Sequence, residues 1–224
     1  MKILAFDTTM AACSAAVVRF ENGGAQVMAA HHETRTRGHA EVLVPMIGEV
    51  MAQAAVSFGD LDRIAVTVGP GTFTGVRVGI ATARGMAVAS GLPVVGITTF
   101  EAVAAGVAAS PGAKQRPIAC VFDARRDEVY VQCFTAGLVA LTEPQALPYR
   151  DAGELITAHR PVLVGTGVHL VMPFEDDDRT SAPIADAADQ PSAVLVAERA
   201  ALGVPATGPP VPLYLRPPDA KLPK

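Results

Sequence analysis

The sequence predicts an α/β protein made of two lobes, each with a mixed β-sheet flanked by helices, the second lobe being reduced. Short apolar runs alternate with stretches of helical periodicity along the whole chain. The first hundred residues give the order strand, strand, strand, helix, strand, helix, strand, and a shorter round of this pattern follows. Three meandering strands before alternating helices and strands indicate a sheet that is antiparallel on one side and parallel on the other.

The first round starts with three apolar strands and then alternates. The segment "ENGG" supplies a tight turn between the second and third strands. The following helix has apolar residues at helical spacing, and each later strand is a short apolar run. The expected elements are strands at 2–9, 13–20 and 25–33, a helix at 39–59, a strand at 63–68, a helix at 72–90 and a strand at 93–98.

The second round repeats the first in shortened form. Its first strand, "IACVFDAR", ends in Asp123 as "ILAFDTT" ends in Asp7, which indicates an internal repeat. The acidic, proline-rich segment 172–192 favours a surface loop, and the proline-rich tail 209–224 an extended chain. The expected elements are strands at 116–125, 128–134 and 138–144, a helix at 151–159, a strand at 161–165 and a helix at 192–203.

This order of elements resembles the ribonuclease-H-like lobe of the actin, sugar-kinase and chaperone ATPase superfamily. We therefore expect a first lobe formed by residues 1–100 together with 192–224, and a second, reduced lobe formed by residues 101–191. The first lobe is also expected to carry the partner interface.

Composition limits the classes of function. The chain has 224 residues, half of them hydrophobic, so a buried core can form without disulfides or metals. Its 22 acidic and 18 basic residues give no basic surface for nucleic acid. The isolated cysteines Cys13, Cys120 and Cys133 favour buried thiols in a reducing compartment. Without a leader or an eighteen-residue apolar stretch, we expect a cytoplasmic protein that contacts no membrane.

The segment "GPGTFTGVRVG" (69–79) follows an apolar strand, as phosphate-binding loops do. A Walker loop needs GxxxxGK[ST], but no lysine follows any of these glycines. A dinucleotide loop needs GxGxxG, but Thr74 stands at the third glycine. Two interpretations remain. Gly75, Gly79 and Ala83 recur every four residues and would give a helix face open to close packing, which we favour. An anion near Thr72 to Thr74 at the helix start is the alternative.

The turn after the first strand is a second candidate for phosphate binding. ATPases of this superfamily have an aspartate and a glycine-containing turn there. Thr8 and Thr9 stand where the glycine would be, and their branched side chains restrict the backbone. Asp7 could hold hydrated magnesium, but an aspartate that ends the strand and hydrogen-bonds the turn is the favoured interpretation. A vestigial nucleotide or anion site would therefore comprise Asp7, Thr8, Thr9, Thr72 and Thr74.

No metal or catalytic motif is complete. The segment "HETRT" begins like HExxH, but Thr36 replaces the second histidine, and His31 and His32 would point to opposite faces of a strand. Arg125 and Arg126 could clamp a phosphate, although a solvated turn is favoured. No GxSxG elbow is present, and no cysteine has a base nearby in sequence. We expect no catalytic residues and no metal ligands.

The helix expected at 39–59 is apolar over a wider arc than one sheet can cover. Val42, Val44 and Met46 add to the stripe of Leu43 and Ile47. Such a helix is either deeply buried or contacts another protein with its second face. Beside the glycine-rich face of the next helix, we favour an interface.

Five segments in order resemble the TsaB family of bacteria, formerly called YeaZ. They are "ILAFDTT", "HAEVLVPMI", "GPGTFTGVRVG", "DARRDEVY" and "PLYLR". The matches are dense to residue 100, clear at 116–134, and return at 212–216. TsaB-like proteins are inactive paralogues of TsaD, which transfers a threonylcarbamoyl group from an adenylate to tRNA. His39 matches one of the paired metal-binding histidines of TsaD, and the other has no counterpart.

The resemblance implies a scaffold for modification of the adenosine that follows the anticodon in tRNAs reading codons that begin with adenine. The implied partners are TsaD, as a heterodimer, and TsaE, with a homodimer when alone and tRNA bound only through the complex. No cofactor is expected on this chain, while ATP and a metal ion belong to partner subunits. The implied interface comprises Leu43, Met46, Ile47, Val50, Met51, Ala54, Gly75, Gly79 and Ala83. The alternative is a self-contained nucleotide-dependent phosphotransferase or a degenerate ATPase on the same fold.

Overall fold

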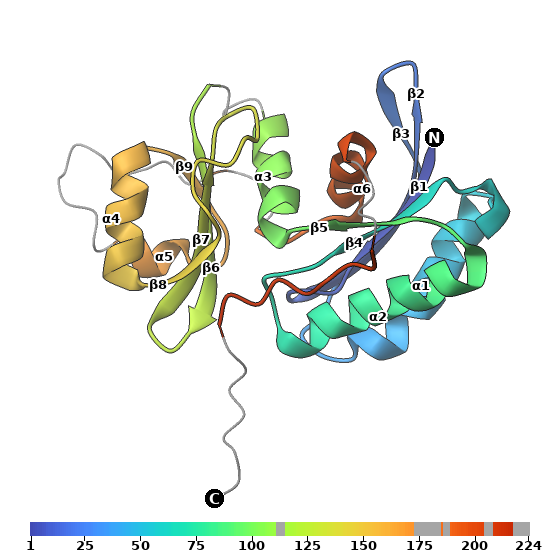
Figure 1. Cartoon of the computed structure of the whole chain (residues 1–224), viewed down its shortest axis with the longest axis horizontal. Coiled ribbons are helices and arrows are strands. Elements are labelled where there is room, and N and C mark those ends of the chain that lie inside the picture. The colour runs from blue at the N-terminus through green and yellow to red at the C-terminus, as the bar shows by residue number, and fades with distance from the viewer. Residues whose placement is uncertain (111–114, 173–184, 186–188, 204–207, 217–224) are drawn as a thin grey trace, which may run out of the picture.

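The computed structural model describes residues 1–110, 115–172, 185, 189–203 and 208–216. The chain forms two mixed β-sheets side by side, and helices cover both (Figure 1). The α/β class with mixed sheets and flanking helices is therefore confirmed. None of the helices described is both long and apolar enough to cross a membrane.

The first sheet has five strands in the order β3-β2-β1-β4-β5. Its β3-β2-β1 part is antiparallel, and its β1-β4-β5 part is parallel. This is the arrangement expected of a ribonuclease-H-like lobe. Its strands are β1 (Lys2–Asp7), β2 (Ala12–Glu21), β3 (Gly24–Thr34), β4 (Arg63–Thr67) and β5 (Val94–Ile97).

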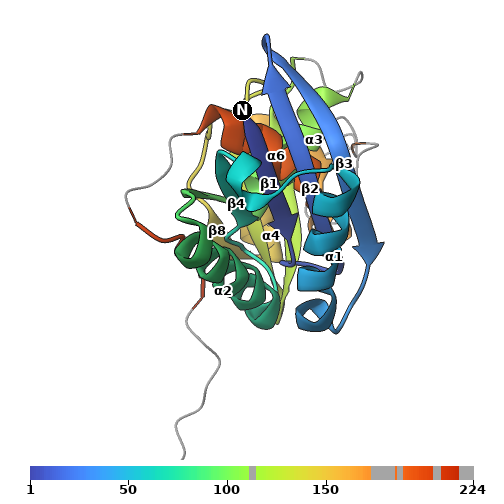
Figure 2. The ribbon, with the colours of Figure 1, turned by 90° about the vertical axis from the view of Figure 1, so that its right-hand side faces the viewer.

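Both faces of this sheet are covered by helices, and the alternation along β1 shows how. Leu4 and Phe6 point to one face, where they pack against α1 (His39–Gln53) and α2 (Phe73–Ser90). Ile3 and Ala5 point to the other face, against α6 (Ala193–Leu202). All four side chains are fully buried. Figure 2 shows α1 and α2 next to each other on the same side of the sheet.

The second sheet has four strands in the order β8-β7-β6-β9, with β9 parallel to β6 and the other pairs antiparallel. The helices α4 and α5 lie on its outer side (Figure 1). Its elements are β6 (Ile118–Arg125), β7 (Glu128–Phe134), β8 (Gln145–Pro148), α4 (Tyr149–His159), β9 (Val162–Val164) and α5 (Val168–Val171).

Helix α3 (Thr99–Ala109) lies between the two sheets (Figure 1). It starts with a capping box, in which Thr98 accepts from the amide of Glu101 and the Glu101 carboxylate accepts from Thr98. Phe100 stacks on Phe122 of β6, with ring centroids 5.3 Å apart. Because α3 contacts elements on both sides, the lobe boundary expected at residue 100 stays a prediction.

Two expectations about local structure are wrong, and two helices were not predicted. Residues 138–144 do not form a strand but a turn with one isolated bridge, and the strand follows at β8. The first helix ends at Gln53, and a 3₁₀ turn, η1 (Phe58–Asp60), replaces its expected last turn. The helices α3 and α5 had no predicted counterpart. Most of the loop expected at 172–192 lies outside the described residues.

Arg63, the first residue of β4, ties α6 to the sheet. Its Nη1 donates to the carbonyl oxygens of Ala200 and Gly203, at 2.8 and 2.9 Å. These carbonyls end the helix and have no partner within it, so a cation is favourable there.

We predict that Arg63→Met lowers the free energy of unfolding by about 2 kcal/mol, because hydrogen bonds from a charged, half-buried donor are lost. Urea unfolding at neutral pH measures it. The control is Arg116→Met, since Arg116 makes an exposed hydrogen bond to Arg160. Equal losses in the two variants would contradict the role of Arg63.

Candidate functional site

The turn after β1 gathers most of the residues predicted for a vestigial anion site. Asp7, Thr8 and Thr9 are all buried. The Oδ1 atom of Asp7 accepts hydrogen bonds from the backbone amide of Thr9 at 3.1 Å, from its hydroxyl at 2.6 Å, and from the hydroxyl of Thr67 on β4. Asp7 therefore ends the strand and hydrogen-bonds the turn, as the favoured interpretation expected.

The second carboxylate oxygen of Asp7 is buried without a hydrogen-bond partner. Burial raises the pKa of Asp7 above its ordinary value, although the hydrogen bonds from Thr67 and Thr9 and the charge of His39 oppose the shift. A neutral carboxyl group is thereby favoured at this position more than in solution.

The segment 69–75, here called the glycine loop, lies directly on this turn. The amide of Thr72 donates to the carbonyl oxygen of Thr9 at 2.7 Å, and the Thr8 hydroxyl donates to the carbonyl of Gly75 at 2.7 Å. A Cβ atom at Gly71 would overlap the Thr9 carbonyl, and one at Gly75 would overlap the Thr8 carbonyl. These glycines therefore allow backbone to touch backbone, where the alternative interpretation placed an anion.

The two threonines of the glycine loop differ. Thr72 is the N-cap of α2, and its hydroxyl accepts from the amide of Gly75 at 3.1 Å. Thr74 is exposed at the helix start. An anion here would have to compete with the cap and with the Thr9 carbonyl. Anion binding at these residues stays a prediction that the packing disfavours.

The residues predicted for a partner interface point inward. Gly75 and Gly79 pack on the Thr8 turn, and a Cβ at Gly79 would come within 2.8 Å of the Thr8 hydroxyl oxygen. Ala83 and the apolar residues of α1 belong to the core between the helices and the first sheet. This corrects the expectation for the whole set, because side chains covered by the sheet cannot touch a partner. The buried residues of α1 and its C-cap are Leu43, Met46, Ile47, Val50, Met51 and Ala54.

The opposite, outward side of α1 and α2 carries a group of small and apolar exposed residues, which we call the outer helix face. Val44 on α1 is 55% exposed and Val88 on α2 is 89% exposed. A Cβ built at Gly48 or Gly85 meets nothing within 4 Å. The two helices contact one another, so their outer sides form one surface (Figure 2). Its members are Val44, Pro45, Gly48, Ala52, Ala81, Gly85, Val88 and Ala89.

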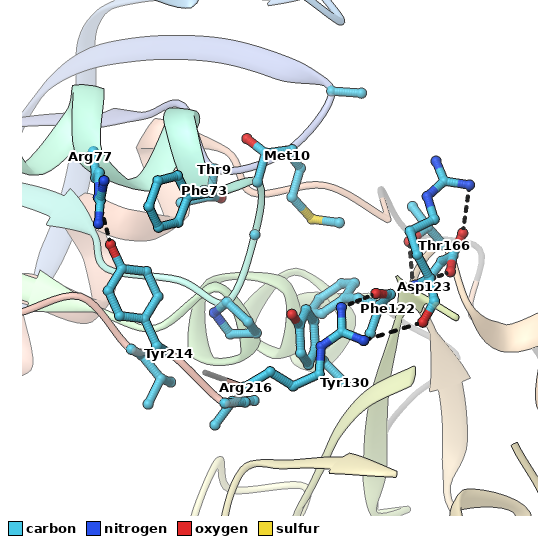
Figure 3. A pocket seen from close by; sticks show the side chains of 18 residues that line it. Thr9, Met10, Phe73, Arg77, Phe122, Asp123, Tyr130, Thr166, Tyr214 and Arg216 are labelled. Carbon is cyan, nitrogen blue, oxygen red and sulfur yellow. Dashed lines mark hydrogen bonds and ion pairs between the residues drawn. The ribbon is translucent and has the colours of Figure 1, made fainter. Parts of the chain in front are cut away.

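A cavity of about 670 Å³ lies between the two sheets, beside the glycine loop. Its walls come from five separate parts of the chain, and Figure 3 shows the side chains that line it. They are the turn at 9–11, the glycine loop with the start of α2, the β6–β7 hairpin, Thr166 and the segment 213–216. Apolar atoms make up most of its surface, as is typical of small-molecule sites.

One wall of the cavity is an aromatic and cationic cluster. The rings of Phe73 and Tyr214 stack with centroids 5.9 Å apart. The Arg77 guanidinium lies 3.5 Å from the centroid of the Phe73 ring, and its Nε donates to the Tyr214 hydroxyl at 2.9 Å. The segment 213–216 is held on this side by a hydrogen bond from the Leu213 amide to the Val68 carbonyl.

The facing wall is formed by the β6–β7 hairpin, and Arg216 connects the two walls. Its guanidinium pairs with Glu128 at 2.8 Å and lies over the Tyr130 ring. Asp123 pairs with Arg125 at 3.0 Å, so Arg125 is engaged within its own hairpin. Burial alone would lower the pKa of Arg216. The hydrogen bonds to Glu128 and Tyr130, together with the charges of these two groups, outweigh burial, so the pKa of Arg216 is raised above its ordinary value.

The hairpin backbone is unusual at its tip. Arg125, Arg126 and Asp127 all have left-handed φ angles, of 63°, 58° and 60°. For residues other than glycine this conformation costs roughly 1 kcal/mol or more each. Arg125 is held there by its own amide, which donates to Asp123 at 2.7 Å, and by Arg216, which donates to its carbonyl. That the two arginines clamp a phosphate stays a prediction.

Histidines and cysteines do not assemble into a metal site in the described part of the chain. The His39 ring nitrogen lies 3.0 Å from the Met10 carbonyl oxygen, and His31 lies 3.2 Å from Glu49. Burial raises the pKa of Cys13 and Cys133 to about 11, so both thiols are protonated at neutral pH.

Sequence reasoning missed the cavity, and it expected an interface on a second face of the first helix but assigned that interface to residues that are buried. Val44 was noted only as widening an apolar arc. The segment "PLYLR" was noted only as a family match, although it brings Tyr214 and Arg216 into the cavity. The four-residue spacing of Gly75, Gly79 and Ala83 did find a closely packed helix face, but the packing is within this chain.

Comparison with known proteins gives a consistent result. Residues 28–141 match a family model described as TsaD, tRNA N6-adenosine threonylcarbamoyltransferase. The tRNA threonylcarbamoyladenosine biosynthesis protein TsaB of Escherichia coli is 38% identical over 130 residues, which are 58% of this chain and 53% of that protein. The match thus spans about half the length of this curated relative. An uncharacterized protein of Mycobacterium tuberculosis is 33% identical to this chain, and the match covers 98% of this chain and 93% of that protein.

Two solved structures from Pseudomonas aeruginosa match nearly the whole chain. One is described as an uncharacterized protein with similarity to peptidase YEAZ, with 30% identity, a TM-score of 0.79, and coverage of 96% of this chain and 99% of that one. The other, YeaZ, has 29% identity, a TM-score of 0.77 and the same coverage.

The contact between the glycine loop and the Thr8 turn predicts opposite effects for two glycines of one helix. Gly75→Ala should lower the free energy of unfolding by about 1–3 kcal/mol or more, because its methyl group overlaps the Thr8 carbonyl. Gly85→Ala should raise it by about 0.5–1 kcal/mol, because alanine favours the helix and nothing is near. Chemical unfolding measures both. Similar effects of the two changes would contradict the close packing.

The raised pKa of Asp7 predicts a pH dependence with a definite sign. A raised pKa in the folded state means that folding takes up protons, so this contribution is present below the ordinary pKa near 3.8 and is lost as pH rises through the folded value. The stability of Asp7→Asn relative to the wild type should therefore increase between pH 4 and pH 7. The increase is about 1.4 kcal/mol per unit of pKa shift.

Urea unfolding across this range measures the difference, and Asp60→Asn is the control. Hydrogen bonds from Ser57 lower the pKa of Asp60, so the contribution of Asp60 is present above the ordinary pKa of 3.8 and is lost only as pH falls below it. The stability of Asp60→Asn relative to the wild type should therefore stay nearly constant between pH 4 and pH 7. A pH-independent difference for Asp7→Asn would show that Asp7 ionises as it does in solution.

Proposed function

The chain belongs to the TsaB family, also named YeaZ, and from this premise we propose that it is a non-catalytic subunit in the biosynthesis of tRNA threonylcarbamoyladenosine. The modified base would be the adenosine that follows the anticodon in tRNAs reading codons that begin with adenine. The chain would act by binding and supporting TsaD.

The glycine loop supports the non-catalytic role most directly. Phosphate chemistry on this fold needs backbone amides that are open to a phosphate group beside the first strand. Here the Thr72 amide is bonded to the Thr9 carbonyl, and the Gly75 amide to the Thr72 hydroxyl. Opening the turn would break both bonds and separate backbone atoms in direct contact. This arrangement favours a scaffold over a self-contained phosphotransferase.

The outer helix face supports the binding role. Its members are small or apolar. The charged side chains beside them are Glu49 on α1, which pairs with His31, and Arg84 on α2, which donates to the Pro210 carbonyl. A surface of small and apolar residues lets the helices of a partner approach closely. The inward sides of the same helices pack in the core, so a partner that binds the outward sides would leave the core unchanged.

The rest of the assembly follows from the family and is proposed with it. TsaD would bind the outer helix face as a heterodimer, and TsaE would join the larger assembly. Without TsaD, two copies of this chain would pair through the same face. ATP and a metal ion would be held by the partner subunits, and tRNA would be bound through the complex in the cytoplasm.

We predict that Val44→Glu and Val88→Glu weaken the complex with the cognate TsaD roughly a hundredfold. Each places an unpaired carboxylate in a buried apolar contact, which costs several kcal/mol. Both positions are exposed in the single chain, so its own stability should change little. Co-expression with tagged TsaD, followed by titration of the purified proteins, measures the affinity.

The matched control is Val139→Glu, an equally apolar residue that is 65% exposed next to the second sheet. It should bind TsaD like the wild type. Unchanged binding by the Val44 and Val88 variants would reject the outer helix face as the interface. Equal weakening by all three variants would also reject it, since the effect would not depend on position.

A further inference from the structure

The cavity between the sheets has no part in the proposed scaffold role, yet its walls are well ordered by specific contacts. Phe73 and Tyr214 are 48% and 44% exposed, and both line the cavity. Large aromatic side chains that stay exposed beside a cavity mark a binding surface more often than a structural one. Their stacking on each other and on Arg77 fixes their positions before any ligand arrives.

Charge on the cavity walls is not balanced. Arg216 is paired with Glu128, and Arg125 with Asp123. Arg77 has no carboxylate partner among the described residues, and its contacts are the Tyr214 hydroxyl and two aromatic rings. Its terminal Nη atoms keep their donors for another group. A guanidinium with free donors beside an apolar cavity favours a carboxylate, sulfonate or phosphate group.

The size and polarity of the cavity limit the chemical class of ligand that it could bind. About 670 Å³ suits a molecule of drug or metabolite size. Phe122 and Tyr130 line the wall across from Phe73 and Tyr214, so rings face the space from both sides (Figure 3). Several of the polar groups that line the cavity are already hydrogen-bonded within the chain: the Thr9 hydroxyl donates to Asp7, and the Thr72 and Thr166 hydroxyls accept from the amides of Gly75 and Asp123. A planar apolar body with one anionic end matches such a site better than a sugar or a peptide.

We propose that this cavity is a binding site for a small planar aromatic anion. The aromatic body lies between the walls of Phe73 and Tyr214 on one side and Tyr130 on the other, and its anionic group pairs with Arg77. The segment 213–216 is part of the site, since it supplies Tyr214 and positions the facing wall through Arg216. The site is separate from the outer helix face and needs no partner protein.

A pair of probes that differ in charge alone tests the proposal on the full chain. 2-Naphthoate and 2-naphthamide have the same ring system, and calorimetric titration measures the dissociation constant of each. We expect 2-naphthoate to bind at one site with at least tenfold higher affinity than 2-naphthamide. Equal affinities would overturn the anionic selectivity, and no saturable binding of either probe would overturn the site itself.

Variants assign the selectivity to Arg77. Arg77→Gln should bring the affinity for 2-naphthoate down to that for 2-naphthamide, which should change little. The matched control is Arg84→Gln, because Arg84 also lies on α2 and donates to the Pro210 carbonyl but does not line the cavity. Anion preference retained in Arg77→Gln, or lost equally in Arg84→Gln, would overturn the role of Arg77. Since the probe pair is compared in the wild type first, an unfolded variant leaves the main test intact.

Discussion

The contact between the glycine loop and the turn after β1 is the constraint on which the rest of the structure depends. Gly71 and Gly75 lie against the carbonyl oxygens of Thr9 and Thr8, where no side chain fits. This contact fixes where α2 begins, and Thr72 caps the helix there. Helix α2 in turn presents three different sides. One side packs inward on the first sheet, one forms part of the outer helix face, and its first turns supply Phe73 and Arg77 to the cavity.

The same constraint accounts for the division of roles along the chain. Backbone amides that could hold a phosphate are used to close the turn, and the carboxyl group of Asp7 is buried beneath it. This closed edge supports the proposal of a scaffold rather than a phosphate-transfer enzyme. Within the described residues, we propose the outer helix face as the surface for a protein partner and the cavity beside the loop as the site for a small molecule.

Much of the first sheet could be predicted from the sequence, because the spacing of apolar residues along the chain reflects which side chains are buried. Short apolar runs and the helical spacing in α1 predicted the strands of the first sheet, its mixed character and the helices that cover it. Periodicity does not tell which buried face meets a sheet and which meets a partner, so Leu43 and Gly75 were assigned to an interface although both are core. The strand expected at 138–144 failed because a short apolar run in a turn looks like a strand. The cavity could not be predicted, since Phe73, Tyr130 and Tyr214 meet only in three dimensions.

The formation of threonylcarbamoyladenosine on unmodified tRNA tests the central claim most directly. The cognate TsaD and its other partner subunits would be supplied with the threonylcarbamoyl adenylate, and this chain would be added in increasing amounts. A scaffold subunit should raise the rate until it matches TsaD in amount, with no product and no ATP turnover from this chain alone. A rate independent of this chain, or phosphoryl transfer catalysed by the chain by itself, would contradict the account.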